Sequence, residues 1–351
     1  MSRNPGLHAA TAVLASTFKR LNHPFKLSFA ITYRCNLKCR MCNIWRKPAD
    51  TRELSIAEID AFLARTQGLS WVGLTGGEPF LRSDLPQIVE SVHRHCGESL
   101  LAVHLATNGQ LVEKIAGLLE HLARMKHRWR PVFTVSIDGP RELHDEIRGQ
   151  AGAWDRAVET LRLLKGTKWV KVKAGFTLSR HNLQAFAGTC AALEGAVPGF
   201  RRDDITVNIF HRSDFYYDNT EMPGLDQISL EAAIDEVLRA LGPVASPATF
   251  LRNRYLRLYK LYARTHRSPV TCRALSSLCF LDPAGDLYPC AIYNKRLVNV
   301  RGMTGTFGEL WRSPEARSLA GECARGRCPS CWNPCDAYSS MLASPLKVLT
   351  S

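Results

Sequence analysis

The sequence predicts an α/β fold, a partial (β/α)6 barrel followed by a small cysteine-rich domain that contains a β-hairpin. Two observations support this fold class. Short apolar runs alternate with amphipathic segments from residue 26 to about residue 210, which is typical of β/α units. Seven of the 12 cysteines then lie between residues 272 and 335, where the alternation has ended. With 45% hydrophobic residues in 351, the chain has ample material for a core.

Each expected strand is an apolar run, and each expected helix follows one in the sequence. The strands lie near residues 27–33, 71–74, 101–106, 132–137, 170–177 and 205–210. The helices lie near residues 56–65, 85–95, 111–125, 154–164 and 183–193. Barrels built from such units carry their chemistry at the carboxyl ends of the strands, so the segments after each strand are the candidates for a site.

The predicted organisation has five parts. Residues 1–25 form an N-terminal helix and linker, 26–220 the barrel core, 221–268 a linker with a basic amphipathic helix, 269–338 the cysteine-rich domain, and 339–351 a C-terminal tail. In the basic helix, Leu251, Tyr255, Leu258 and Tyr262 share one face. Its arginines and lysine then form either a solvated side or a contact with an anionic substrate or lipid headgroup.

The net charge and the cysteine content indicate which binding partners and which cellular compartment to expect. The net charge is +14, which attracts nucleic acid, anionic lipid or a phosphorylated substrate. No five consecutive Lys or Arg residues occur, so a stable nucleic-acid complex is not expected. No apolar run reaches the length of a transmembrane segment, and the N-terminus lacks a signal-peptide cleavage pattern. We therefore expect a cytoplasmic protein whose cysteines bind metal rather than form disulfides.

The first candidate site is the loop after the first strand, where Cys35, Cys39 and Cys42 have the spacing C-x3-C-x2-C. Three thiolates can bind three irons of a [4Fe-4S] cluster and leave the fourth iron open to a small molecule. The alternative is a zinc site, but zinc prefers paired C-x2-C hooks that supply four ligands. The next cysteine in the chain is Cys96, so no fourth ligand is near.

This loop resembles the signature of the radical S-adenosylmethionine (SAM) enzymes. The resemblance implies that the open iron chelates SAM and that the cluster donates an electron to it. SAM then breaks into methionine and a 5′-deoxyadenosyl radical, which removes a hydrogen atom from the substrate. It also implies a flavodoxin or ferredoxin as the electron donor.

The segment after the second strand contains Gly76, Gly77, Glu78 and Pro79. Two glycines allow a close backbone approach, and the carboxylate accepts hydrogen bonds from an ammonium group. A plain Gly-Gly turn before a helix is the alternative. The segment resembles the family's GGEP motif, which implies that these four residues hold the amino group of SAM.

Further candidates follow the third and fourth strands. Thr107 and Asn108 end the third strand in an Asn-Gly turn, and the resemblance places them near SAM. At the end of the fourth strand it implies that Ser136 faces the SAM ribose and that Arg148 pairs with a carboxylate. Asp138 is a candidate contact for ribose or substrate, with an Asx turn as the alternative.

After the fifth strand, Asn182 is a weaker candidate for a substrate contact. The segment 208–219, after the sixth strand, mixes aromatic and polar residues. It suits either a substrate wall or a packed surface loop.

The second candidate site lies in the C-terminal region. Residues 280–289 read as a hairpin, and Cys328 and Cys331 form a C-x2-C hook, so a second cluster held by Cys272, Cys290, Cys328 and Cys331 is predicted. The region resembles the SPASM/Twitch extension of radical SAM enzymes, because 12 residues separate Cys272 from a Gly-x4-Cys segment ending at Cys290. The later spacing departs from the two-cluster pattern, which favours one auxiliary cluster. Cys335 is a further candidate ligand, and a zinc site is the alternative.

The reaction predicted is abstraction of a C–H hydrogen from a small molecule, such as a sugar, nucleoside or other metabolite, followed by dehydrogenation or epimerisation. Epimerisation needs a thiol that returns a hydrogen atom, and the available thiols are Cys96, Cys190, Cys279, Cys323 and Cys335. The alternatives are a peptide-modifying maturase that cross-links or oxidises a peptide residue, and a non-catalytic iron–sulfur electron-transfer protein.

Overall fold

The computed structural model describes residues 5–48, 52–66 and 68–350. Nine strands form one sheet in the order β6-β5-β4-β3-β2-β1-β7-β8-β9. Their bounds are β1 Lys26–Thr32, β2 Trp71–Gly76, β3 Ala102–Thr107, β4 Arg130–Ser136, β5 Lys171–Leu178, β6 Ile205–Ile209, β7 Leu278–Leu281, β8 Asp286–Tyr288 and β9 Val298–Asn299. The first six are parallel, which confirms the six predicted strands. The sheet is open, because β6 and β9 form its two edges.

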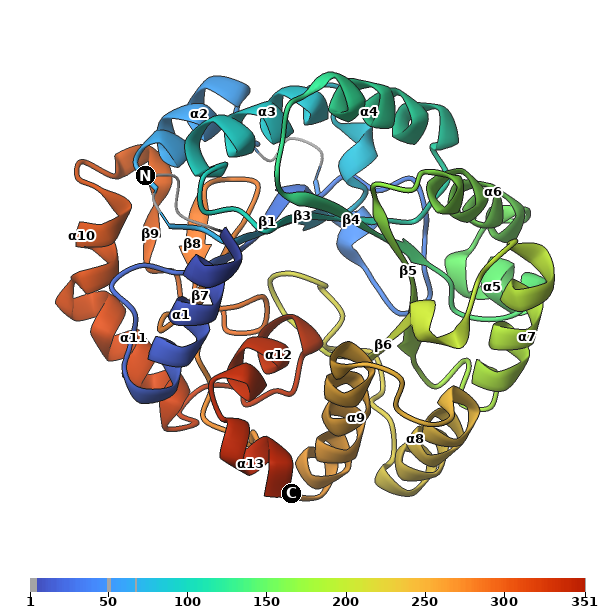
Figure 1. Cartoon of the computed structure of the whole chain (residues 1–351). Coiled ribbons are helices and arrows are strands. Elements are labelled where there is room, and N and C mark those ends of the chain that lie inside the picture. Colours follow the sequence, from blue (N-terminus) through green and yellow to red (C-terminus); the bar gives the residue numbers. More distant parts are fainter. Residues whose placement is uncertain (1–4, 49–51, 67, 351) are drawn as a thin grey trace.

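The sheet curves around a central space, and most helices cover its outer face (Figure 1). The α-helices are α1 Pro5–Phe18, α2 Ile56–Ala64, α3 Leu85–Cys96, α4 Val112–Arg124, α5 Arg141–Arg148, α6 Ala153–Gly166, α7 Phe186–Ala196, α8 Gln227–Leu241, α9 Pro247–Thr265, α10 Phe307–Arg312, α11 Pro314–Ala324, α12 Pro334–Leu342 and α13 Pro345–Thr350. One continuous hydrophobic cluster joins the strands to these helices, from Leu27 in β1 to Val348 in α13.

The predicted hairpin exists as β7 and β8, which pair antiparallel. Its placement was not predicted. β7 pairs parallel to β1, with Lys26 opposite Leu278 and Phe29 opposite Leu281. The hairpin therefore extends the sheet of the barrel and does not form a sheet of its own. No local pattern indicates this pairing, because the two strands lie about 250 residues apart.

Two helical segments differ from the expectations. α5 was not predicted as a helix, because it is only eight residues long and has only two apolar residues, Leu143 and Ile147. Residues 221–268, expected to form a linker with a basic amphipathic helix, contain α8 and α9, and α9 corresponds to that helix. Residues 339–351, expected to be a tail, contain the end of α12 and the whole of α13.

α9 has the predicted amphipathic character, because Tyr255 and Leu258 are buried. Its basic side is partly occupied by ion pairs with α8. Lys260 pairs with Asp235 at 2.9 Å, and Arg264 pairs with Glu231. These pairs attach α9 to α8, so two of its basic residues have a partner within the chain. Among the described helices, none combines the length and apolarity needed to cross a bilayer.

Candidate active site

The loop that carries Cys35, Cys39 and Cys42 directly follows β1 and is fastened from two sides. The Arg40 amide donates to the Ile147 carbonyl of α5 at 2.9 Å, and the Asn43 amide donates to the Tyr217 carbonyl at 2.9 Å. These bonds satisfy two backbone amides of the loop and tie it to α5 and to the segment after β6. The three thiols are thus presented at the carboxyl end of the sheet.

The environment of these thiols fits a positively charged group. All three are half-buried, and burial raises the pKa of the Cys35 thiol to about 11 and that of the Cys42 thiol to about 12. Burial disfavours the thiolate, so ligation needs a cationic partner that stabilises it. The Arg148 guanidinium supplies part of that charge, since its Nη1 lies 3.7 Å from Cys39 Sγ. The irons of a cluster would supply the rest.

The segment after β2 rests directly on this loop. The Gly77 amide donates to the Thr32 carbonyl and the Glu78 amide to the Arg34 carbonyl, both at 2.8 Å. Gly76 has φ +130°, and a Cβ there would lie 2.0 Å from the Thr32 carbonyl oxygen. A Cβ on Gly77 would lie 2.1 Å from the Arg34 carbonyl oxygen. Both glycines are required because two backbones meet here.

Glu78 is fully buried and joins the ends of β2 and β3. Its Oε2 accepts from the Asn108 amide at 2.7 Å, and its Oε1 accepts from Thr107 Oγ1 at 2.9 Å and from the Phe80 amide at 3.2 Å. Burial raises the pKa of Glu78 to about 7. A carboxylate has about four acceptor positions, so one position is left for an ammonium donor. Pro79 begins the short 3-10 helix Pro79–Leu81 that closes this segment.

Asn108 connects this group to the cysteine loop. Its Nδ2 donates to Asn36 Oδ1 at 2.8 Å and lies 4.0 Å from Cys35 Sγ. The structure therefore brings Glu78, Thr107 and Asn108 together beside Cys35, as the resemblance implied. Their contact with SAM stays a prediction.

A buried ion pair lies on the other side of the loop. Asp138 follows β4 and is completely buried, and it pairs with Arg148 at the end of α5. The Thr177 amide donates to Asp138 Oδ1 at 2.8 Å, and the Asp138 amide donates to His144 Nδ1 at 3.1 Å. The charged partner raises the pKa of Arg148 against the effect of burial. Asp138 thus holds Arg148 against Cys39, and its contact with ribose or substrate stays a prediction.

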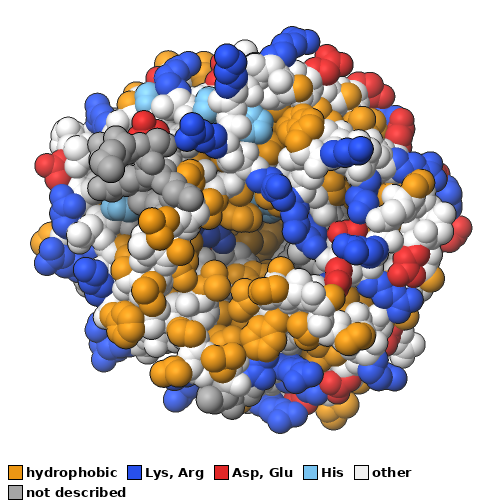
Figure 2. Space-filling view, viewed as in Figure 1, with side chains coloured by type: hydrophobic (Ala, Val, Ile, Leu, Met, Phe, Trp, Pro, Cys, Tyr) orange, Lys and Arg blue, Asp and Glu red, His pale blue; other side chains and the backbone are white. Residues whose placement is uncertain are grey.

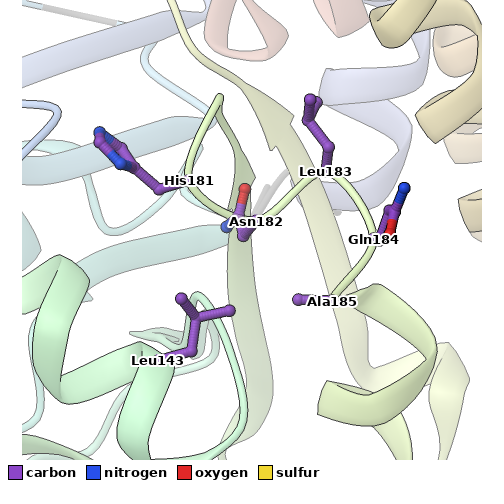
Figure 3. A pocket seen from close by; sticks show the side chains of 6 residues that line it. All are labelled: Leu143, His181, Asn182, Leu183, Gln184 and Ala185. Atoms are coloured by element: carbon purple, nitrogen blue, oxygen red, sulfur yellow. The ribbon is translucent and has the colours of Figure 1, made fainter.

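The remaining two predicted residues lie at the ends of β4 and β5. Ser136 is the last residue of β4 and is half-buried. Asn182 Nδ2 donates to the Asp138 carbonyl at 2.8 Å and to the Thr177 carbonyl at 3.0 Å, so its amide ties two strand ends together. Asn182 also lines an open depression of about 450 Å³ with Leu143 and Leu183 (Figure 3).

A second cavity, of about 190 Å³, lies directly beside the cysteine loop. Its wall combines Arg40 and Met41 of that loop with residues after β5 and β6, namely Ser179, Arg180, His181, Phe210, Met222 and Pro223. Two arginines and a histidine over an apolar floor suit a molecule with an anionic end and a hydrocarbon body.

An aromatic block fills the space between the cysteine loop and the C-terminal region. The rings of Tyr216 and Tyr217, from the segment after β6, pack at a tilt of 53° with centroids 4.6 Å apart, and Tyr216 packs edge-on against Phe280 of β7 at 5.0 Å. The Tyr216 hydroxyl lies 3.3 Å from Thr75 Oγ1. The sequence indicated a wall or a packed loop for residues 208–219. The structure shows a packed block, and no periodicity or spacing identified Tyr217 within it.

Tyr217 packs against two apolar clusters, one beside each cysteine group. The first cluster is also bordered by Cys35 and Cys42. The second contains Cys290 and Cys323 and is also bordered by Cys272 and Cys331. Tyr217 therefore adjoins the surroundings of both groups of thiols.

The C-terminal cysteines gather as a group of five. The four predicted ligands Cys272, Cys290, Cys328 and Cys331 lie together, and Cys323 of α11 joins them. The Cys290 and Cys331 thiols share a hydrogen bond, as do the Cys323 and Cys328 thiols. The pKa of Cys328 falls to about 6 because Cys323 donates to it. We refer to these five residues as the C-terminal thiol group.

Within the described ranges, no three Cys, His, Asp or Glu side chains converge on a point that suits a single metal ion. An iron–sulfur cluster does not need ligands that converge on one point, because each thiolate binds a different iron. Five neighbouring thiols, four of them joined in hydrogen-bonded pairs, fit such a group by their donor chemistry.

Cys335 lies outside the C-terminal thiol group. It is exposed, near the start of α12, and its charge would act on Tyr216 and Tyr217. Its carbonyl accepts from Lys26 Nζ. The other three thiols named as hydrogen donors, Cys96, Cys190 and Cys279, are enclosed in the hydrophobic core.

Comparison with known proteins agrees with this geometry. The family model described as the Radical SAM superfamily matches residues 29–189, and the model described as an iron–sulfur cluster-binding domain (SPASM) matches residues 272–336. A mycofactocin maturase (MftC) from Mycolicibacterium smegmatis is 27% identical over 91% of this chain and 78% of its own length. An AdoMet-dependent heme synthase from Oleidesulfovibrio alaskensis is 25% identical over 82% of this chain and 74% of its own.

Solved structures share the fold. SuiB from Streptococcus suis, bound to S-adenosylmethionine, has a TM-score of 0.57 at 15% identity and covers 90% of this chain and 71% of its own. The structure described as anSMEcpe with bound AdoMet has a TM-score of 0.56 at 17% identity, covering 86% and 80%. The chain therefore belongs to the radical SAM superfamily, carries a C-terminal SPASM domain, and uses SAM and [4Fe-4S] clusters.

Proposed function

We propose that this enzyme removes a C–H hydrogen from a small molecule and passes the electron left on the substrate to an auxiliary cluster, so that the substrate is dehydrogenated. The observation that carries this proposal is the position of Tyr217, which packs against the apolar clusters beside both cysteine groups. SAM bound at the first cluster supplies the 5′-deoxyadenosyl radical. Loss of a hydrogen atom, an electron and a proton then amounts to a two-electron oxidation.

The residues of the chain have separate tasks in this scheme. Glu78 offers its last acceptor position to the SAM ammonium, and Asp138 orients Arg148 toward Cys39. Cys272, Cys290, Cys328 and Cys331 hold the auxiliary cluster, and Cys323 is the fifth neighbour that competes for a ligand position. The cavity beside the cysteine loop, with Arg40 and Arg180, favours a substrate that carries a carboxylate or phosphate.

Epimerisation is the competing outcome for the same substrate radical. Of the five thiols considered, Cys335 is the one exposed toward the tyrosine block. Its S–H would return a hydrogen atom and leave no net oxidation. Incorporation of deuterium from heavy water into recovered substrate, abolished in Cys335→Ala, would favour this route.

A peptide substrate is a second candidate. MftC is named as a maturase, and SuiB has been solved bound to the precursor peptide SuiA. Both are similar to this chain over about nine-tenths of its length. A peptide that raises the rate of 5′-deoxyadenosine formation, where metabolites do not, would favour this function.

The electron donor we propose is a flavodoxin or ferredoxin, and the compartment is the reducing cytoplasm. All 12 cysteines are free thiols, which supports a compartment in which disulfides do not form.

The experiment that tests the proposal uses anaerobically reconstituted protein. Iron and sulfide are counted, SAM and dithionite are added, and 5′-deoxyadenosine is measured. About eight irons per chain are expected for two clusters. A count of about four irons, all lost when Cys35, Cys39 and Cys42 are replaced, would show that the C-terminal cysteines hold no cluster. The dehydrogenation route would then be excluded. With eight irons but no SAM cleavage, the electron-transfer function would be favoured.

A further inference from the structure

The two helices at the ends of the chain expose apolar side chains to solvent. Within the described ranges, 11 large hydrophobic residues are exposed, and six of them fall in residues 7–18 and 342–349. They are Leu7, Leu14, Phe18, Leu342, Leu346 and Leu349. We call these six residues the terminal apolar face.

α1 is oriented opposite to an ordinary surface helix. Its exposed stripe contains Leu7, Leu14 and Phe18, which is 82% exposed, whereas it buries Ala9 and Ser16. A surface helix normally turns its apolar stripe to the core. α13 repeats the pattern, because Leu346 is 78% exposed and Leu349 is exposed too.

Polar contacts hold α1 in this orientation. Arg20 Nε donates to the Leu275 carbonyl at 2.8 Å, and its guanidinium lies over the Trp311 ring at 5.0 Å. The Leu21 amide donates to the Ser276 carbonyl at 3.0 Å. The helix is thus anchored by the residues that follow it, and its large side chains are left for another contact.

The terminal apolar face is continuous across the two ends of the chain. Arg273 Nη2 donates to the Thr17 carbonyl at 3.2 Å and to the Ala343 carbonyl at 3.4 Å, which ties the end of α1 to the end of α12. Phe18 adjoins the first of these carbonyls and Leu342 the second. Figure 1 shows α1, α12 and α13 on one face of the molecule, and Figure 2 shows hydrophobic side chains spread over the lower part of that face, around the central hollow.

The chain segments that carry this face, together with the segment that joins α1 to α12, contain no acidic residue. Residues 1–25, 268–281 and 337–351 contain no Asp or Glu. Lys19 and Lys347 are exposed within it, beside Phe18 and Leu346. Asp336, which immediately precedes the last segment, is buried. An apolar face with lysines and without carboxylates is complementary to a surface that combines hydrocarbon with negative charge.

We propose that the terminal apolar face docks the enzyme on a membrane surface that contains anionic phospholipid. Leu14, Phe18, Leu346 and Leu349 enter the boundary between headgroups and acyl chains, and Lys19 and Lys347 contact the phosphates. The net charge of +14 attracts the protein over a longer range. The contact is peripheral, in keeping with the finding that no described helix suits a membrane span.

The test uses the reconstituted full-length enzyme and sedimentation with vesicles of phosphatidylcholine alone or with about one-third phosphatidylglycerol. Binding to the anionic vesicles is expected, with at least about a fivefold loss when salt rises from about 0.1 M to about 0.5 M. Phe18→Ser with Leu346→Ser is expected to weaken binding about tenfold or more. Lys19→Glu with Lys347→Glu is expected to weaken it at least about fivefold.

Ile228→Ser is the matched control, because Ile228 is 84% exposed on α8, away from this face. It is expected to leave vesicle binding unchanged. Absence of binding to anionic vesicles at low salt overturns the proposal, as does an equal effect of Ile228→Ser and of Phe18→Ser with Leu346→Ser. Sedimentation velocity tests whether a second copy of the chain binds this face instead. If the wild-type enzyme is a dimer that does not bind vesicles, and Phe18→Ser with Leu346→Ser makes it a monomer, the face is a dimer interface.

Discussion

Replacement of Gly77 by alanine should displace the segment after β2 from the cysteine loop. A Cβ at this position lies 2.1 Å from the Arg34 carbonyl oxygen, and ordinary contact begins near 3.4 Å. The two backbones must therefore separate by about 1.3 Å. A side chain could relieve such a clash by changing its rotamer, but the clashing atom here belongs to the main chain and cannot.

The energetic cost follows from the bonds that this shift breaks. The Gly77–Thr32 and Glu78–Arg34 backbone bonds, both 2.8 Å long, would be lost. At about 1 kcal/mol each, with about 1–3 kcal/mol for the overpacking, the free energy of unfolding should fall by about 3–5 kcal/mol. The displaced loop should also hold less iron, since it carries Cys35.

The assay is urea unfolding of the iron-free protein, followed by far-ultraviolet circular dichroism, together with iron analysis after reconstitution. Gly117→Ala is the control: it lies within α4, and a Cβ there meets nothing within 4 Å. It should stabilise the protein by up to about 1 kcal/mol, because alanine favours helix more than glycine does. A Gly77→Ala protein within about 1 kcal/mol of wild type, with a full iron content, would refute the close contact described here.

Three further predictions concern buried charges and thiols. Burial raises the pKa of Glu78 to about 7, so the free energy of unfolding of the iron-free protein should fall by about 3 kcal/mol as pH rises from about 4.5 through about 7. Urea titrations of Glu78→Gln should lack this fall. If the free energy of unfolding of Glu78→Gln depended on pH as that of wild type does, titration of Glu78 would not be its cause. Asp138→Asn should cost about 3–5 kcal/mol because it leaves the Arg148 guanidinium buried without a counter-charge. The double variant Asp138→Asn with Arg148→Met should recover most of the lost stability. If the double variant were as unstable as Asp138→Asn alone, the unpaired charge of Arg148 would not be the cause. Cys290→Ser should lower the iron content of the auxiliary site and Cys335→Ser should not; the reverse order in an iron count would exclude our grouping of the thiols.

The spacing of a few residues predicted much of the site. Cys35, Cys39 and Cys42 lie within eight residues, so their convergence on one loop follows from the sequence alone. Glu78 and Asn108 closely follow the ends of parallel strands, which meet at one edge of the sheet, and the family resemblance singled them out.

What was missed depends on contacts between distant segments. Cys323 lies in α11, outside any short hook, and only the packing of that helix brings it to Cys290. The ion pair of Asp138 with Arg148 was not predicted, because Arg148 is carried by α5, which has too few apolar residues to be recognised as a helix. Local periodicity cannot report such pairings, because they are decided by tertiary structure.

The parallel pairing of β7 with β1 has a consequence for how the enzyme can be divided. Lys26 to Phe29 bond to β2 on one side and to β7 on the other, so β1 is an interior strand of the sheet. A fragment that ends before residue 278 would leave the backbone of β1 unpaired along one side, and an exposed edge of that kind recruits other chains. The barrel is therefore expected to aggregate when expressed without its C-terminal domain. The β1–β7 ladder also joins the barrel and the C-terminal domain in one sheet, with no hinge between them. It therefore keeps the two groups of thiols at a constant separation, and we expect any movement that admits substrate to occur in the loops.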